Sequence, residues 1–135
     1  MKISEMASIE REIPFRIYDT KGKVIDTKKI TVKELPDLER ISIRETCTVT
    51  KRNRKEIDEA KFKNIIGARM VIDAPFETEG GVSWKEMSES QKRVYLKSLS
   101  TNYSAQVEKI LGEVLPEFTK VNENGETEED LSETP

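Results

Sequence analysis

The chain has 135 residues, of which 35% are hydrophobic and 36% are charged. Globular domains usually carry about 25% charged residues, so this length and composition predict one domain with a small core and argue against a large, deep pocket. The formal net charge of -3 argues against a dedicated nucleic-acid-binding protein.

Histidine is absent, and Cys47 is the only cysteine. The absence of histidine removes the commonest general base and metal ligand, and a lone cysteine excludes an internal disulfide or a cysteine-based zinc site. The sequence also lacks the run of about 18 apolar residues that a transmembrane helix needs, and the apolar stretch of a signal peptide. These absences remove most hydrolase mechanisms, and we expect a cytoplasmic protein without a cofactor or metal.

The N-terminal third predicts an arm followed by a β-hairpin. Residues 1–11 have loosely spaced apolar side chains and are expected to form a flexible arm. Apolar and polar residues alternate over residues 12–18, as in a strand with one buried face, and Pro14 confines this strand to a sheet edge because proline has no N–H. A turn at residues 19–22 then leads into a second strand at residues 23–33.

A short helix is predicted over residues 36–45, because it starts with proline, which favours the first helical position, and acids follow in the first turn. Leu35, Leu38 and Ile41 are expected to form its inner stripe. Residues 42–50 also alternate as a strand does, so both helix and strand remain open for that segment.

A long amphipathic helix is predicted over residues 55–73, with apolar side chains on more than half of its circumference, and we expect it to be the most buried element. A surface loop at residues 77–82 follows. Two helices, at residues 89–99 and 100–116, then form an α-hairpin, and Ser88 with Gln91 has capping-box spacing at the start of the first. Residues 120–135 contain six carboxylates and one lysine, which predicts a disordered acidic tail.

Together these elements predict an α+β fold that is mainly α: an N-terminal β-hairpin, a small bundle of about four helices and a disordered acidic C-terminal tail. The expected organisation is a flexible arm at residues 1–11, a single domain at residues 12–119 and the tail at residues 120–135.

Several clusters have a chemical interpretation, and each also has a plain structural one. The carboxylates at residues 58–59 and 128–130 could serve acid-base or metal chemistry, but acids favour a helix start and a solvated tail. The basic run at residues 51–55 could grip phosphates or form a solvated loop. Residues 80–81 are glycines without the rest of a phosphate-binding loop, and Cys47 has no imidazole to activate it, so a small packing residue is expected there.

Trp84, Tyr95 and Tyr103 are the candidate partner-binding residues. Large amphipathic rings dominate binding energies, and the two tyrosines lie on the predicted C-terminal α-hairpin near lysine and arginine side chains. The alternative is that the rings complete the core, and both interpretations stay open. No catalytic, cofactor-binding or metal-binding residue is assigned.

The run from Ile30 to Ile41, ITVKELPDLERI, resembles the strand-to-helix junction of minor tail protein G, the tail assembly chaperone of lambda-like siphophages. In that family a V-T-V strand leads into S-E-L-x-x-L-x-R-I. The matching positions here hold Glu34, Leu35, Leu38, Arg40 and Ile41. The downstream helix, loop, α-hairpin and acidic tail follow in the family's order, so the resemblance covers about residues 12–135. It departs from the pattern at Lys33, at Pro36 and in the extra N-terminal arm.

The resemblance implies a non-enzymatic protein that coats the helical tape measure protein and keeps it soluble in the host cell cytoplasm, and that is absent from the mature virion. It further implies that a frameshifted, longer form binds the major tail protein; self-association stays open. The residues themselves leave one alternative, a small nucleic-acid-binding or regulatory module that uses the basic run at residues 51–55. No membrane partner is expected.

Overall fold

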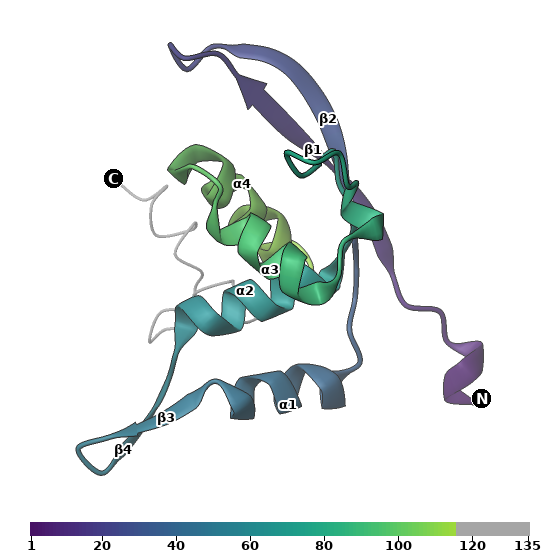
Figure 1. Ribbon diagram of the computed structural model, residues 1–135. Helices are drawn as coiled ribbons and strands as arrows, with labels where there is room; N and C mark the ends of the chain where they lie inside the picture. The colour runs from purple at the N-terminus through teal and green to yellow at the C-terminus, as the bar shows by residue number, and fades with distance from the viewer. Residues whose placement is uncertain (116–135) are drawn as a thin grey trace, which may run out of the picture.

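The computed structural model describes residues 1–115 (Figure 1). The tail predicted at residues 120–135 lies outside the described part. The last described helix ends at Gly112, before the expected end at residue 116. Five strands and four α-helices in residues 1–115 make the fold mixed α+β. The expectation of a mainly α fold is wrong, because three short strands occupy positions that the apolar pattern had assigned to helix or left open.

The predicted N-terminal hairpin is confirmed. Strands β1 (Glu10–Tyr18) and β2 (Val24–Lys33) pair antiparallel, and β5 (Val71–Asp73) joins the other edge of β2 to give the order β1-β2-β5. Strand β1 is therefore an edge strand, as Pro14 predicts. The hairpin turn contains Gly22 at a φ of 82°, and Figure 1 shows the turn reaching beyond the helices.

The N-terminal arm holds one short 3-10 helix, η1 (Ile3–Glu5), and its residues are exposed. Strand β1 begins at Glu10, two residues before the expected start, so the arm is shorter than predicted. The backbone N–H of Ile9 donates to Oε1 of Glu34 at 2.9 Å, and the N–H of Glu34 donates to the carbonyl of Ile9 at 3.1 Å. These two bonds connect the end of the arm to the first residue after β2.

Helix α1 (Asp37–Thr46) starts one residue later than predicted, with Pro36 as its N-cap. The predicted inner stripe is wrong, because Leu38 is 81% exposed and Ile41 is 45% exposed. Ile43 and Cys47 are buried instead. These two residues lie four apart and share one face, so turning Leu38 inward would turn both of them out.

A second antiparallel hairpin separates α1 from the central helix. Strands β3 (Thr48–Lys51) and β4 (Arg54–Ile57) meet in a two-residue turn, in which Arg52 and Asn53 have φ values of 50° and 63°. Positive φ at both central residues is typical of a type I′ turn, which matches the twist of paired strands. The open segment at residues 42–50 is therefore helix up to Thr46 and strand from Thr48.

Helix α2 (Glu59–Met70) is shorter than the predicted helix at residues 55–73, because β4 precedes it and β5 follows it. Its start is capped by Asp58, whose carboxylate accepts a hydrogen bond from the N–H of Lys61 at 3.1 Å. Among the described helices it contributes the most buried residues, as expected. The missing side chain of Gly67 lets α2 approach its neighbours closely, since an added Cβ would lie 3.0 Å from Cδ1 of Leu96.

The predicted α-hairpin is present as α3 (Glu89–Lys97) and α4 (Thr101–Gly112), preceded by the 3-10 turn η2 (Trp84–Glu86). The capping signal at Ser88 is confirmed, because Ser88 and Gln91 exchange hydrogen bonds between side chain and backbone at 2.9 and 3.1 Å. Both helices pack on α2 (Figure 1).

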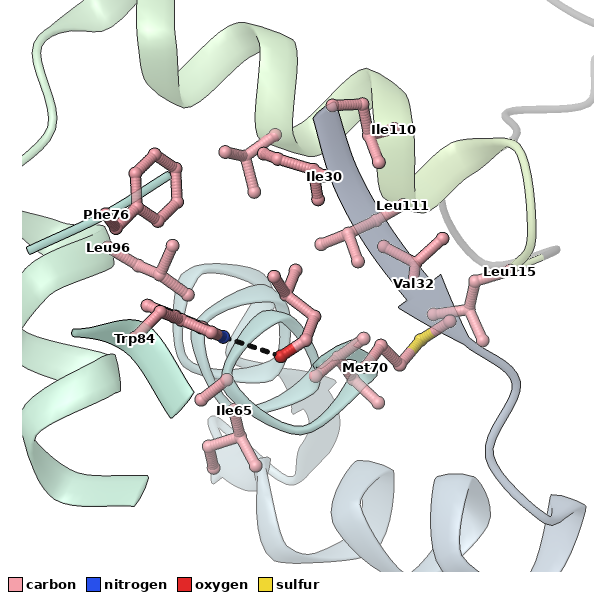
Figure 2. Packing of buried hydrophobic residues seen from close by; sticks show 14 of the residues in the cluster. Ile30, Val32, Ile65, Met70, Phe76, Trp84, Leu96, Ile110, Leu111 and Leu115 are labelled. Atoms are coloured by element: carbon pink, nitrogen blue, oxygen red, sulfur yellow. Dashed lines mark hydrogen bonds between the residues drawn. The ribbon is translucent and has the colours of Figure 1, made fainter. Parts of the chain in front are cut away.

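The core lies where the sheet, α2 and the α-hairpin meet (Figure 2). Side chains of Ile30 and Val32 from β2 lie near Leu111 and Leu115, at and beyond the end of α4. The indole N–H of Trp84 donates to the carbonyl of Val71 at 2.8 Å, which satisfies both buried groups. A polar bond at the centre of an apolar cluster thus connects η2 to the start of β5.

Candidate functional site

Helix α3 borders two surface pockets. One pocket of about 480 Å³ lies among α2, α3 and α4. Its apolar lining residues are Ala60, Leu96, Leu99, Val107 and Leu111. Charged groups stand at its rim, where Lys63 of α2 forms a salt bridge with Glu108 of α4. An apolar lining with a charged rim suits a ligand that is itself amphipathic.

The second pocket, of about 510 Å³, is bounded by α3 and by the loop that holds Glu77 and Glu79. Val94, Tyr95 and Leu99 supply its apolar and aromatic lining. Val94 is 63% exposed, although it is a large apolar side chain. Leu99 lines both pockets, so the two are neighbours at the end of α3. We call them together the α3 surface.

The structure separates the three aromatic residues that the sequence had grouped. Trp84 has no exposed surface and belongs to the core, which favours the packing alternative for that ring. Tyr95 is half-buried, lines the second pocket and packs against Phe76 with a ring separation of 5.0 Å. Tyr103 is also half-buried but bonds to the backbone of Tyr18 in β1, away from the residues of the α3 surface.

Val94 and Leu99 line the pockets and were missed as candidates from the sequence. The signal was present in the sequence, because Val94, Tyr95 and Leu96 are consecutive. Three consecutive positions span about 200° of the helix circumference, and a single neighbouring element cannot cover an apolar surface that wide. In the structure Leu96 is buried, Tyr95 is half-buried and Val94 is exposed.

The β3–β4 hairpin, residues 48–57, is a second candidate site, which we call the basic hairpin. Lys51, Arg52, Arg54 and Lys55 are all exposed at its tip. Lys51 lies directly opposite Arg54 in the strand register, and like charges at such positions repel. Within residues 1–115, none of these four side chains forms a salt bridge. The tip therefore presents uncompensated positive charge.

The remaining sequence candidates have structural roles. Asp58 caps α2, and Gly81, at a φ of 88°, lies in a turn closed by the bond from its N–H to the carbonyl of Thr78 at 2.9 Å. Cys47 has no exposed surface, and burial raises the pKa of its thiol, which opposes nucleophilic chemistry. The acids at residues 128–130 lie outside the described residues.

Within residues 1–115, no group of three or more acidic, cysteine or histidine side chains is placed to hold a metal ion. The helices of the same residues are too short and too polar to cross a membrane. The described features are therefore an apolar surface along α3 and a charged hairpin tip, both of which suit binding. Searches with the chain found no matching protein-family model, no matching curated protein and no matching solved structure.

Proposed function

We propose that the chain is a tail assembly chaperone of the siphophage type, which binds the tape measure protein and keeps it in solution in the host cell cytoplasm. The α3 surface is the observation that carries this proposal. A helical client can lay its apolar stripe against Leu99 and its neighbours, which is a common mode of helix recognition. As a chaperone the protein would leave before the virion matures, and a frameshifted, longer form would bind the major tail protein.

The composition of the α3 surface supports a client of this kind. Its rim carries both signs of charge, with Glu59 and Lys97 at the first pocket and Glu77 and Glu79 at the second. An amphipathic helix has polar flanks that can pair with such a rim while its apolar face is covered. Tyr95 adds an aromatic ring beside the pocket, a residue type that is enriched among strong binding contacts.

The strand-to-helix junction also supports the proposal. The segment that resembles minor tail protein G is a strand-to-helix junction in the structure, because β2 ends at Lys33 and α1 begins at Asp37. Two of the matching residues, Leu38 and Ile41, are exposed, so core packing does not account for their apolar character. The face of α1 that they share is the competing location for the client.

Coexpression with the tape measure protein of the same phage genome tests the function. The chain should raise the soluble fraction of the client several-fold and copurify with it. Val94→Glu should abolish both effects without unfolding the protein, because Val94 is 63% exposed. Val24→Glu is the matched control, since Val24 is an exposed valine on β2, and it should behave like the unchanged chain.

The possible outcomes distinguish a wrongly assigned binding surface from a wrongly assigned function. Loss of copurification with Leu38→Glu but not with Val94→Glu would move the client to α1 and leave the chaperone function standing. A client that stays insoluble with the unchanged chain, or is equally soluble without it, would overturn the function itself.

The basic hairpin favours a second function, a small nucleic-acid-binding or regulatory module. Its four exposed cations are the specific observation. Phosphate contacts make affinity fall steeply as salt rises. A mobility shift below micromolar concentration at physiological salt, lost at high salt and lost with Lys51→Glu, would favour this module over the chaperone.

A further inference from the structure

The basic hairpin carries a repulsion that the described residues leave uncompensated. The sequence of residues 48–57 has four basic side chains and one acid, Glu56. The register sets Lys51 against Arg54, and Arg52 adopts a positive φ that glycine or asparagine would adopt at lower cost. Figure 1 shows the hairpin projecting from the helices, and its four basic side chains are exposed. An anionic group docked at the tip would relieve this repulsion.

Several other basic side chains of the described residues have partners. On β2, Lys28 pairs with Asp26 and Lys29 pairs with Glu12, both at 3.5 Å. On α3, Lys92 lies 5.3 Å from the centre of the Trp84 ring, and Arg93 donates to the side chain of Asn64. The basic hairpin thus differs from these surfaces in having no acid or ring against its cations.

The same chain contains a segment of opposite charge. Residues 116–135 carry seven acidic side chains and one basic one, a net charge of -6. Residues 1–115 carry 22 basic and 19 acidic side chains, a net charge of +3. The charge is therefore divided between the described part and the C-terminal twenty residues, with the densest acids at residues 128–130.

The C-terminal segment is long enough to reach the hairpin. It begins after Leu115, which is buried beside Val32 and Met70 (Figure 2). Twenty residues span up to about 70 Å when extended, and a domain of this size is about 35 Å across. A tethered segment also meets its site at a local concentration in the millimolar range, which favours contact even when each ion pair is weak.

We propose that the acidic C-terminal segment, residues 116–135, docks on the basic hairpin of the same chain. Its carboxylates pair with the side chains of Lys51, Arg52, Arg54 and Lys55. The contact is electrostatic, so it weakens as salt screens it. While docked, the segment competes with other polyanions, nucleic acids included, for these side chains.

A spin label on Ser132→Cys in the full-length chain tests the contact. Cys47 can stay in place, because it is buried and its thiol pKa is raised, so the reagent modifies the new cysteine alone. In dilute protein at low salt, the label should broaden the amide signals of residues 50–55 at least about twofold more than those of the β1–β2 turn. The broadening should disappear at 0.5 M salt, where the screening length is only about 4 Å.

Charge reversal supplies the matched comparison. Lys51→Glu with Lys55→Glu should remove the broadening, whereas Lys21→Glu with Lys23→Glu, which changes the same number of exposed lysines at the other hairpin turn, should preserve it. Broadening that survives the first pair, that is equal at both turns, or that vanishes on dilution would overturn docking within one chain. Unchanged amide signals from the core would show that each variant is folded.

An oligonucleotide probe distinguishes the segment from nucleic acid as the occupant. Neutralising the tail by Glu128→Gln, Glu129→Gln and Asp130→Asn should tighten binding of a 20-nucleotide DNA duplex to the full chain by about twofold or more, because the tethered competitor is weakened. Equal affinity with and without these substitutions, together with loss of binding in Lys51→Glu, would assign the hairpin to nucleic acid and overturn its occupation by the segment.

Discussion

The side-chain amide of Gln106 on α4 hydrogen-bonds both backbone polar groups of Arg16 on β1. The N–H of Arg16 donates to Oε1 at 2.9 Å, and Nε2 donates to the carbonyl of Arg16 at 2.9 Å. Tyr103 does the same at Tyr18, accepting from its N–H at 3.0 Å and donating to its carbonyl at 3.3 Å. Pro14, which lies two residues before Arg16 on the same edge of β1, has no N–H. Helix α4 thus occupies the edge where a further strand would otherwise pair.

Gln106→Leu should therefore destabilise the fold and expose the strand edge. Two hydrogen bonds at a partly exposed site are expected to contribute about 1–2 kcal/mol to the free energy of unfolding. Urea unfolding followed by circular dichroism measures the loss, and sedimentation velocity should show new association through β1. Lys109→Leu on the same helix adds a similar apolar side chain without touching these bonds, and equal behaviour of the two variants would contradict the role of Gln106.

Trp84→Phe should lower the free energy of unfolding by more than the smaller volume of the phenylalanine ring alone would. The substitution leaves the carbonyl of Val71 buried without its donor, which is worth about 1–3 kcal/mol. Unfolding monitored by circular dichroism is the suitable measurement, because Trp84 is the only tryptophan. Tyr95→Phe keeps its ring in place and should change stability by less than about 0.5 kcal/mol. A Trp84→Phe protein as stable as Tyr95→Phe would show that the bond to Val71 is dispensable.

Gly67→Val should force α3 and α4 away from α2. An added Cβ already lies 3.0 Å from Cδ1 of Leu96 and 3.5 Å from Cδ1 of Leu111, and two more methyl groups must displace both leucines. Overpacking of this kind costs about 1–3 kcal/mol. The melting temperature should fall by several degrees, whereas Gly80→Ala, in open surroundings, should leave it nearly unchanged. An unchanged melting temperature for Gly67→Val would mean that the helices are loosely packed here.

Burial raises the pKa of the Cys47 thiol, and this makes stability depend on pH in the alkaline range. In the unfolded chain the thiol ionises near its ordinary pKa of about 8.5, while the folded protein keeps it neutral. The unfolded state therefore loses its proton first, and the free energy of unfolding should fall as pH rises above that value. Cys47→Ala should show a shallower decline between pH 8 and 10 in urea titrations. Parallel declines in the two proteins would contradict this effect.

The sequence predicted those elements whose start or position depends on residues close together in the chain. Pro14 marked an edge strand, and Ser88 with Gln91 marked a helix start. Strand β5 was missed because its pairing with β2 joins residues about 40 positions apart, such as Thr31 and Asp73. The basic hairpin was missed because its turn uses Arg52 and Asn53, where a glycine would have been the usual signal.

The candidate site was predicted less well than the fold. Tyr95 was placed on the right helix, but exposure cannot be read from residue type, and Trp84 is buried while Val94 is open. The burial of Trp84 and the partial burial of Tyr95 depend on Phe76, whose ring lies against both of theirs. This packing joins segments on either side of a turn, so the apolar spacing within one helix does not predict it.

The burial of Leu115 has a consequence for how gene products of different length can share one fold. This side chain is 4% exposed and belongs to the same buried cluster as Val32 and Met70, so the described core extends to residue 115. Messages that diverge downstream of that codon would encode proteins that share this described interior and differ in their C-terminal extensions. A single folded body can in this way carry interchangeable endings, and selection on those endings need not disturb the residues that hold it together.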